Sequence, residues 1–287
     1  MNFKSNVLIT GNLGYIGTVL TNFLIKKNYH VVGLDSGLFE ECILCEDTPP
    51  HNQILKDIRD VTLEDFKNFE IIVYLSAISN DPLGEFDKQI TNDINYLGAV
   101  KFAKKAKISG TKKFIFISSQ SMYGISKIDD ELDEDKSEKN PITEYAKTKW
   151  KAEKEILNLN SVDFTTVSLR PSTVFGSSPR LRCDIVFNNL LACAFTTKEI
   201  IIKSDGSPWR PVIHIKDVCN AIHAIIIAPK SLVAGKSFNI GIPNGNFTVK
   251  EIAETVKKLI PNSKLRFTGE HTDNRTYKVS FKKILTE

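Results

Sequence analysis

Tyr145 and Lys149 are the residues whose types and spacing most directly suggest chemistry. They lie in residues 141–150, which read PITEYAKTKW. Two side chains four positions apart on a helix share one face, about one turn from each other. An ammonium beside a phenol favours the phenolate, so Tyr145 could act as a base near neutral pH. The same spacing arises by chance on many solvated helices, so this interpretation depends on the elements that position the pair.

A glycine-rich turn follows a short apolar strand at residues 6–10. Gly11, Gly14 and Gly17 have the spacing G-x-x-G-x-x-G, and residues 18–25 carry apolar side chains at helical spacing. Glycine lets the backbone approach a pyrophosphate, and the start of a helix offers free N–H groups. A tight turn without a ligand would also account for the glycines. The next strand decides between these two interpretations.

That strand, residues 29–34, ends at Asp35, which lies 18 residues after Gly17. A carboxylate at about this spacing accepts hydrogen bonds from the adenosine ribose of a dinucleotide. It would repel a 2′-phosphate, and no arginine follows it directly. The glycine turn, the helix and the acid together predict an NAD site and favour NAD over NADP.

Apolar strands and helices continue to alternate through the first half of the chain. Strands are predicted at residues 53–58, 71–75, 113–118 and 163–169, and helices at 63–69 and 90–107. This alternation predicts an α/β fold, a Rossmann-like doubly wound parallel sheet covered on both faces. Polar residues at the strand ends, among them Asp35, Asp57, Ser76 and Ser119, should therefore gather on one rim of the sheet.

The regular alternation of strands and helices ends after residue 170. We predict a nucleotide-binding domain at residues 1–170 and a smaller substrate-binding domain at 171–287, with about 212–228 packing back on the first. Residues 185–196 and 247–259 are predicted helices, and Thr248 with Glu251 forms a capping box. Residues 204–211 are predicted to be a turn. The acidic run at 129–140 is predicted to be a solvated surface loop.

Composition excludes several classes of protein. The chain is 41% hydrophobic and 25% charged with a net charge of +4, which is too mild to indicate nucleic-acid binding. Its apolar runs are far shorter than the roughly 18–20 residues that span a bilayer. The five cysteines are odd in number and no secretory leader precedes them, which favours reduced thiols and a cytoplasmic protein. Cys42 and Cys45 lack a second ligand pair, so no metal site is expected.

Taken together, these motifs resemble the extended short-chain dehydrogenase/reductase family, in particular its NAD-dependent nucleotide-sugar epimerases and dehydratases. The resemblance covers nearly the whole chain. It rests on the glycine signature, the acid at Asp35, the segment 118–124 and the pair Tyr145 and Lys149. The resemblance implies that Ser119, Tyr145 and Lys149 are catalytic. Tyr145 would take a sugar hydroxyl proton, Lys149 would lower the Tyr145 pKa and bind the nicotinamide ribose, and Ser119 would orient the reacting oxygen.

The resemblance also implies two sets of binding residues. Those expected at the NAD site are Gly11, Gly14, Tyr15, Ile16, Gly17, Asp35, Asp57, Ile58, Leu75, Ser76, Ala77, Asn95, Lys149 and Pro171. Those expected to contact a nucleotide-diphosphate sugar are Ser119, Thr173, Asn189, Arg210 and Arg275. Asn95 matches an asparagine with a structural role in the family, and Arg210 matches its phosphate-binding arginine. A homodimer through the helices that bear Asn95 and Tyr145 is also implied.

Two departures from the family pattern bear on the reaction. Dehydratases and decarboxylases carry acids just after the catalytic Ser or Thr, where this chain has Gln120 and Ser121. Relatives usually continue for some tens of residues beyond Glu287, so the substrate domain is expected to be shortened. The sequence therefore favours an epimerase, similar to UDP-glucose 4-epimerase, acting through a transient 4-keto sugar. A reductase of a 4-keto-deoxy sugar nucleotide and a non-catalytic NAD-binding regulator are the alternatives.

Overall fold

The computed structural model describes residues 3–45, 48–125, 131–269 and 276–287. Its centre is a parallel sheet of seven strands in the order β11-β7-β5-β4-β1-β2-β3. The strands are β1 (Asn6–Thr10), β2 (His30–Asp35), β3 (Asn52–Leu55), β4 (Ile71–Tyr74), β5 (Lys113–Ile117), β7 (Thr165–Pro171) and β11 (Lys236–Ile240). This confirms the predicted Rossmann-like α/β fold. The strand β11 had not been predicted.

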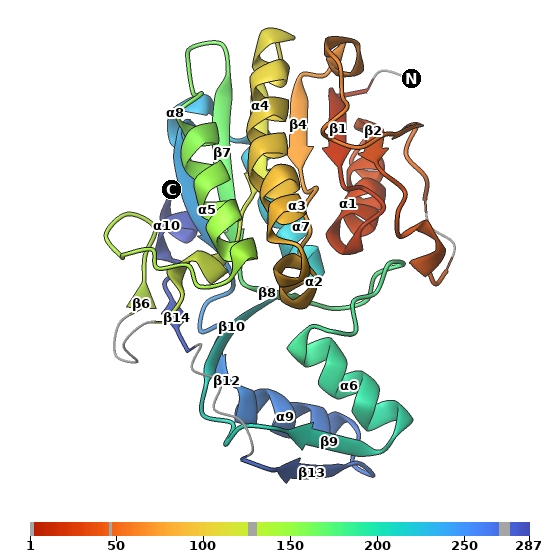
Figure 1. The fold of residues 1–287 in the computed structure, drawn as a ribbon, viewed down its shortest axis with the longest axis vertical. Helices are drawn as coiled ribbons and strands as arrows, with labels where there is room; N and C mark the ends of the chain where they lie inside the picture. The colour runs from red at the N-terminus through yellow and green to blue at the C-terminus, as the bar shows by residue number, and fades with distance from the viewer. Residues whose placement is uncertain (1–2, 46–47, 126–130, 270–275) are drawn as a thin grey trace.

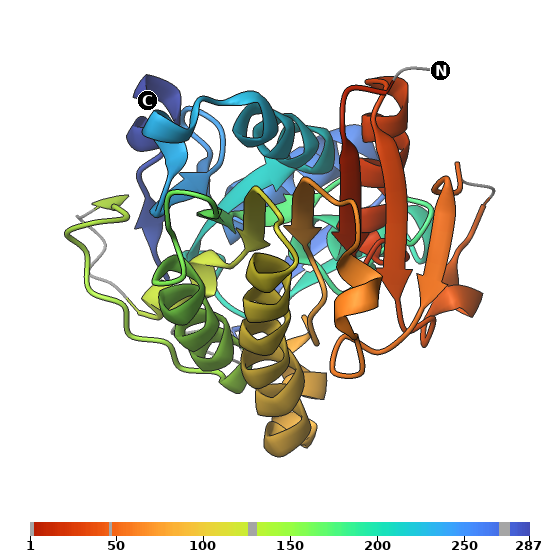
Figure 2. The same ribbon diagram turned by 90° about the horizontal axis from the view of Figure 1, so that it is seen from above.

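Helices cover both faces of this sheet (Figures 1 and 2). One face carries α4 (Ala99–Ile108) and α5 (Glu144–Leu157), and the other carries α1 (Tyr15–Lys26), α7 (Ile215–Ile227) and the short α8 (Lys230–Val233). Successive strand side chains point to opposite faces. In β1, Val7 and Ile9 therefore join the core under α1 and α7, while Leu8 joins the core under α4 and α5.

The helix predicted at residues 90–107 is interrupted. It consists of α3 (Lys88–Asn92), a π-helical segment (Asp93–Gly98) and α4, preceded by the short α2 (Asp81–Phe86). Such π-helical turns are rare and often occur at functional sites. This one carries Asn95. The helix predicted at 63–69 is a single 3₁₀ turn (Leu63–Phe66), and further 3₁₀ turns occur at Glu40–Cys42 and Gln120–Tyr123.

A smaller lobe lies below the sheet in Figure 1 and has its own apolar core. It contains α6 (Val186–Thr196), α9 (Val249–Leu259), β9 (Glu199–Ile202) and β13 (Lys264–Phe267). A second sheet joins this lobe to the main one and contains β8 (Thr173–Phe175), β10 (Trp209–His214) and β12 (Asn246–Thr248). The capping box of Thr248 and Glu251 is confirmed. The predicted turn at 204–211 is wrong at its end, because β10 begins at Trp209.

The acidic run is more buried than predicted. β6 (Glu131–Leu132) pairs with β14 (Lys278–Val279), which α10 (Lys282–Thr286) follows. Glu134 is only 5% exposed, and its Oε1 accepts a hydrogen bond of 2.6 Å from the Asn239 amide of β11. The prediction of a solvated loop is therefore wrong for Glu134. Residues 126–130 lie outside the described residues.

The chain crosses between the two lobes more than once after residue 170. Both α7 and β11 belong to the main lobe, although β9, β13 and α9 belong to the smaller one. A boundary at residue 170 stays a prediction on this basis. In the part of the chain that the structure describes, no helix has the length and apolar character needed to cross a bilayer.

Candidate active site

A cleft of about 1880 Å³ opens between the carboxyl ends of the sheet strands and the smaller lobe. Sheets of this type bind ligands at that edge because the helix N-termini and the loops meet there. A pocket for one drug-sized ligand has roughly 300–1,000 Å³. The larger volume is sufficient for two ligands side by side, such as a dinucleotide and a second nucleotide.

The glycine turn between β1 and α1 forms one end of the cleft. Gly11 has φ of +70°, and a Cβ atom placed there would lie 2.9 Å from the Ser76 amide nitrogen. A Cβ at Gly17 would lie 2.2 Å from the Gly11 carbonyl oxygen. Gly14 is the N-cap of α1, no side chain caps this helix, and its first turn contains no acid. Uncapped N–H groups beside a backbone without side chains suit a pyrophosphate.

Asp35 lies at the end of β2 beside this turn. Its carboxylate accepts hydrogen bonds from the Leu13 amide at 3.2 Å and the Gly37 amide at 3.1 Å. Burial raises its pKa, and these hydrogen bonds oppose that change. Asp57, the next acid along the rim, is ion-paired with Arg59 at 2.7 Å. Two carboxylates at one end of the cleft suit the ribose and adenine of NAD, so the residues present fit this cofactor.

Asn95 acts behind the cleft rather than in it. Its amide makes two hydrogen bonds to the backbone of Ile78, from the Ile78 N–H at 2.8 Å and to the Ile78 carbonyl at 3.0 Å. These bonds hold the loop that follows β4 and carries Leu75, Ser76 and Ala77. Asn95 is 1% exposed and does not line the cleft. Asn95 therefore supports the predicted NAD site through the loop after β4 and does not line it.

Ser119 and Tyr145 meet at the centre of the cleft. Ser119 follows β5, and its hydroxyl is hydrogen-bonded to the Tyr145 phenol. The Ser119 Oγ also lies 2.8 Å from the Ser121 Oγ. Tyr145 lies in the first turn of α5, whose N-cap Thr143 accepts a hydrogen bond from the Ala146 amide at 3.2 Å. The start of α5 thus fixes the position of the phenol.

The electrostatics of the pair differ from the sequence prediction. Burial raises the pKa of Tyr145, and the Ser119 hydrogen bond and the Arg182 charge oppose this rise. Burial lowers the pKa of Lys149 to about 7, against the opposing charge of Glu153. Lys149 is 2% exposed, and its Nζ lies 4.3 Å from the centre of the Phe116 ring. In this structure Ser119 and Arg182, rather than Lys149, favour the phenolate.

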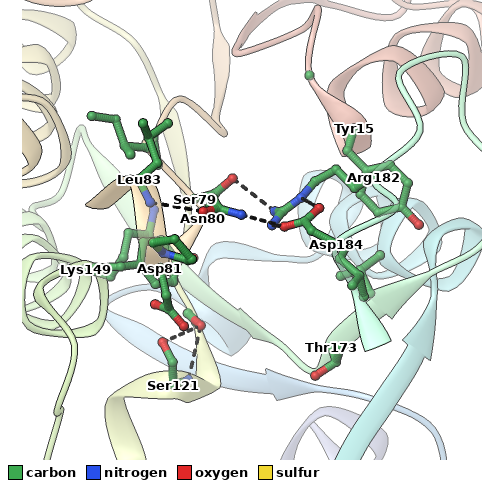
Figure 3. A pocket seen from close by; sticks show the side chains of 18 of the residues that line it. Tyr15, Ser79, Asn80, Asp81, Leu83, Ser121, Lys149, Thr173, Arg182 and Asp184 are labelled. Carbon is green, nitrogen blue, oxygen red and sulfur yellow. Dashed lines mark hydrogen bonds and ion pairs between the residues drawn. The ribbon is translucent and has the colours of Figure 1, made fainter. Parts of the chain in front are cut away.

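Arg182 is a cleft residue that the sequence analysis missed (Figure 3). Its guanidinium binds both oxygens of Asp184, at 3.0 and 2.6 Å, and donates to the Ser79 hydroxyl at 3.1 Å. Asn80 donates to the same Asp184 carboxylate at 2.8 Å. The ion pair lowers the pKa of Asp184 to about 2. The signal in the sequence was weak: Arg180 and Arg182 sit in an irregular segment just after β8.

Most of the predicted site residues line this one cleft. They are Gly11, Gly14, Tyr15, Ile16, Gly17, Asp35, Asp57, Ile58, Leu75, Ser76, Ala77, Ser119, Tyr145, Lys149, Pro171, Thr173 and Arg210. Asn189 is exposed and does not line the cleft, because its side chain donates to the Cys183 carbonyl at 3.0 Å. Its neighbour Asn188 is buried and donates to the Tyr15 hydroxyl at 3.1 Å. Arg275 lies outside the described residues.

Among the residues that the structure describes, no group of three or more His, Cys, Asp or Glu side chains could hold a metal ion. His214 and His223 do not line the cleft and have other contacts. His214 is the N-cap of α7, and its Nδ1 accepts from the Lys216 amide at 3.3 Å. His223 packs against Phe23.

Known proteins with similar sequences include epimerases and dehydratases that act on nucleotide sugars. A UDP-glucose 4-epimerase of Mycolicibacterium smegmatis is 29% identical over 248 residues, which is 82% of this chain and 76% of the relative. A mouse dTDP-D-glucose 4,6-dehydratase is 25% identical over 90% of this chain and 74% of its own length. The solved structure of MoeE5 in complex with UDP-glucuronic acid and NAD is 22% identical, with a TM-score of 0.85 over 98% of this chain and 91% of that one.

The family assignment follows from a match over most of the chain. Residues 7–241 match the NAD dependent epimerase/dehydratase family, and this range contains the glycine turn, Asp35, Ser119, Tyr145 and Lys149. The relatives are NAD-dependent enzymes that act on nucleotide sugars. The cleft described above fits the cofactor of that family. The chain belongs to the NAD dependent epimerase/dehydratase family.

Proposed function

We propose that the protein is an NAD-dependent nucleotide-sugar epimerase that inverts a sugar carbon through a transient 4-keto sugar. The observation that carries this proposal is the meeting of Ser119, Tyr145 and Lys149 in one cleft, with the Ser119 hydroxyl bonded to the Tyr145 phenol. A UDP-hexose such as UDP-glucose is the first substrate to consider, because the curated relative with 29% identity is a UDP-glucose 4-epimerase.

The chain supplies the proton chemistry of this reaction. Bound NAD would supply the hydride acceptor and donor. Tyr145 takes the proton of the sugar hydroxyl as the ketone forms and returns it afterwards. Ser119 holds the reacting oxygen within reach of the phenol, which is a positioning effect. The Ser119 hydrogen bond and the Arg182 charge stabilise the phenolate as it forms, and Lys149 would bind the nicotinamide ribose.

The residues after Ser119 favour epimerisation over loss of water. Elimination needs an acid and a base beside the sugar ring. Gln120 is neutral and 1% exposed, and its side chain turns inward to donate to the Arg170 carbonyl at 3.0 Å. Ser121 is occupied by its 2.8 Å contact with Ser119. Neither residue offers the carboxyl group that elimination would require.

The position of Arg182 supports a second candidate substrate for the same reaction. This substrate is a nucleotide sugar with an acidic substituent. Its charge lies close enough to act on the Tyr145 phenol. Asp184 and Ser79 occupy three of the five guanidinium N–H donors, and among the described residues no hydrogen-bond acceptor takes the other two, which could bind a ligand. Arginine suits a carboxylate because its donors are planar and paired. MoeE5, which shares the fold, was solved with UDP-glucuronic acid.

Replacement of Tyr145 by Phe tests the catalytic proposal. The variant should keep its NAD affinity and lose turnover by roughly 10²–10⁴-fold, which is typical when a positioned acid–base group is removed. Turnover is followed by the interconversion of sugar nucleotides without added cofactor. Survival of turnover in the variant would refute the role of Tyr145. Stoichiometric consumption of NADH with a keto sugar would indicate the reductase, and NAD binding without turnover of any sugar nucleotide would indicate the regulator.

A comparison of UDP-glucose with UDP-glucuronic acid tests the acidic substrate. If the sugar carries a carboxylate, Arg182→Met should raise KM for UDP-glucuronic acid at least about tenfold, since a charged hydrogen bond contributes about 1.5–3 kcal/mol. KM for UDP-glucose should change little. Arg266→Met serves as a control, because Arg266 lies on β13 and is ion-paired with Glu199 at 3.5 Å, away from the cleft. Equal turnover of both sugars by the parent protein would refute the acidic substrate.

We also propose that the protein is a cytoplasmic homodimer. Large apolar side chains are exposed on the helices before and within the π-helical segment, with Phe86 89% and Leu97 49% exposed. Such side chains are typical of helix-to-helix interfaces. Light scattering after gel filtration measures the oligomeric state, and Leu97→Lys, which lies outside the cleft, should shift a dimer towards the monomer.

A further inference from the structure

A buried ion pair lies directly behind the candidate active site. Arg170, near the end of β7, is 2% exposed, and Glu153 of α5 is fully buried. The Arg170 Nη2 and Nε lie 2.5 and 3.0 Å from the Glu153 Oε1, and Ser237 donates to the same oxygen at 3.1 Å. Burying two charges costs several kcal/mol in desolvation for each ion, so a pair of this kind adds little net stability. Its position suggests another role.

Glu153 shares a helix face with Lys149. The two residues are four positions apart on α5, and both are buried. The charged group that acts on the Lys149 ammonium is Glu153, and β5 contributes the Phe116 ring. Asp81 of α2 and Arg182 act on Tyr145 instead. The Glu153 carboxylate is therefore the anion that opposes the loss of charge on buried Lys149.

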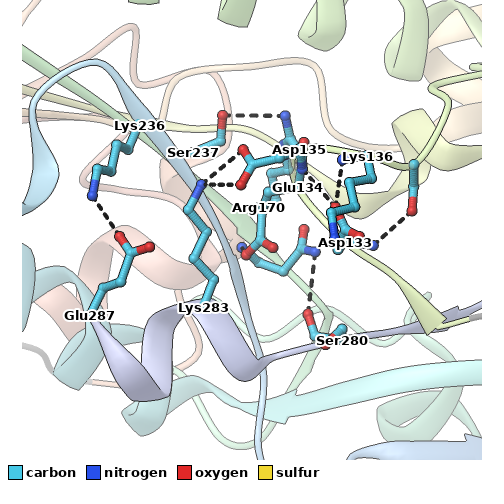
Figure 4. Close-up of polar contacts among 12 residues, drawn as sticks. Asp133, Glu134, Asp135, Lys136, Arg170, Lys236, Ser237, Ser280, Lys283 and Glu287 are labelled. Atoms are coloured by element: carbon cyan, nitrogen blue, oxygen red, sulfur yellow. Dashed lines mark hydrogen bonds and ion pairs between the residues drawn. The ribbon is translucent and has the colours of Figure 1, made fainter.

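Arg170 ties this carboxylate to the segment that carries Ser119. Its Nη1 donates to the Tyr123 hydroxyl at 2.9 Å, and its backbone carbonyl accepts from the Gln120 side chain at 3.0 Å. Figure 4 shows Arg170 beside Glu134 and the C-terminal helix, where Lys283 binds Asp135 at 3.0 Å. Arg170 and Ser237 thus fix the orientation of the Glu153 carboxylate, and Arg170 links it to the segment that contains Gln120 and Tyr123.

We propose that Glu153, held by Arg170, is a positioning residue that keeps the Lys149 ammonium charged and aimed into the cleft. This inference rests on the proposed function, in which Lys149 works with Tyr145. The Arg170 guanidinium holds the Glu153 carboxylate in its orientation through hydrogen bonds from Nε and Nη2. The Arg170–Glu153 ion pair also joins α5, which carries Tyr145, to the segment that follows Ser119.

The test is the titration of Lys149 itself, measured without any sugar substrate. Competitive labelling with acetic anhydride at a series of pH values, followed by peptide mass spectrometry, gives the midpoint at which Lys149 becomes a reactive amine. Glu153→Gln alone leaves the Arg170 charge buried without its partner, which is strongly destabilising. The variant to use is therefore Glu153→Gln with Arg170→Met, which removes both charges. Glu155→Gln is the control, because Glu155 lies on the same helix but binds Tyr96.

We expect the double variant to fold and the Lys149 midpoint to fall by about one pH unit or more. NAD affinity at pH 7.5, measured by calorimetry, should weaken about tenfold, because fewer Lys149 side chains remain charged. The control should keep both values. A folded double variant with the parent's midpoint and NAD affinity would overturn the proposal and leave the ion pair a structural contact. Retained turnover in Tyr145→Phe would instead refute the proposed function, whatever the midpoint shows.

Discussion

Replacing Lys149 by Met should stabilise the folded protein while it damages the site. Lys149 is 2% exposed, and burial lowers its pKa from 10.5 to about 7. Between these two pH values the unfolded chain binds a proton that the folded chain does not. A group of this kind makes the folded state less stable at low pH, and its penalty shrinks as the pH rises through that window.

The size of the effect follows from the two pKa values. The penalty is about 4 kcal/mol at pH 7 and about 2 kcal/mol at pH 9. Methionine has no charge to bury and nearly the same length, so Lys149→Met should remove the penalty. Met also loses the cation–π contact between the Lys149 Nζ and the Phe116 ring centre, 4.3 Å apart. This loss should offset up to about 2 kcal/mol of the gain in stability. The change in the penalty between the two pH values, about 2 kcal/mol, does not depend on how Met packs.

Urea unfolding at pH 7 and pH 9, followed by circular dichroism, measures this change. The stability advantage of Lys149→Met should be about 2 kcal/mol larger at pH 7 than at pH 9. Lys147→Met is the matched control, because Lys147 lies on the same helix and is exposed; it should change stability by no more than about 0.5 kcal/mol at either pH. An advantage of equal size at both pH values, or a loss of stability at pH 7, would refute the reasoning. NAD affinity should fall in Lys149→Met alone.

Two further substitutions test how the cofactor end of the cleft is built. Gly17→Ala places a Cβ 2.2 Å from the Gly11 carbonyl oxygen, and this overpacking should cost about 2 kcal/mol and weaken NAD binding; Gly84→Ala, whose nearest contacts would be 3.8 Å away, should be neutral or stabilising in thermal unfolding. Asn95→Leu leaves the N–H and carbonyl of Ile78 without their partner, so we expect a loss of about 1–3 kcal/mol and faster hydrogen exchange at Ile78.

The parts of the fold that the sequence predicted are those encoded locally. Strands such as β1 and β5 are continuous apolar runs that end at glycine or serine, and a parallel strand buried on both faces needs little else. β10 was missed because Pro208 and Pro211 flank Trp209 and indicated a turn. The segment is a strand because β8 and β12, distant in the sequence, pair with it on either side. Pairing of that kind leaves no local signature.

The same distinction separates the predicted site residues from the missed one. The glycine turn, Asp35 and Tyr145 each sit at a fixed offset from an element that can be recognised in the sequence. Arg182 has no such offset, because its position depends on Ser79 and Asp184, and Ser79 lies 103 residues away along the chain. Glu134 illustrates the same limit, since it becomes buried only when β11 covers it. Charged residues in loops are placed by partners that the local sequence does not contain.

Burial explains why the spacing of Tyr145 and Lys149 does not by itself make Tyr145 a base. Burial moves the pKa of Tyr145 up and that of Lys149 down, so it works against the phenolate and the ammonium at once. Each is opposed by a group from another part of the chain, Ser119 and Arg182 for the phenol and Glu153 for the ammonium. Spacing on α5 therefore brings the two side chains together, but the charge on each depends on contacts outside the Tyr-x-x-x-Lys motif. A chain that kept the motif and lost the Ser119 hydroxyl should therefore bind NAD normally but turn its substrate over slowly.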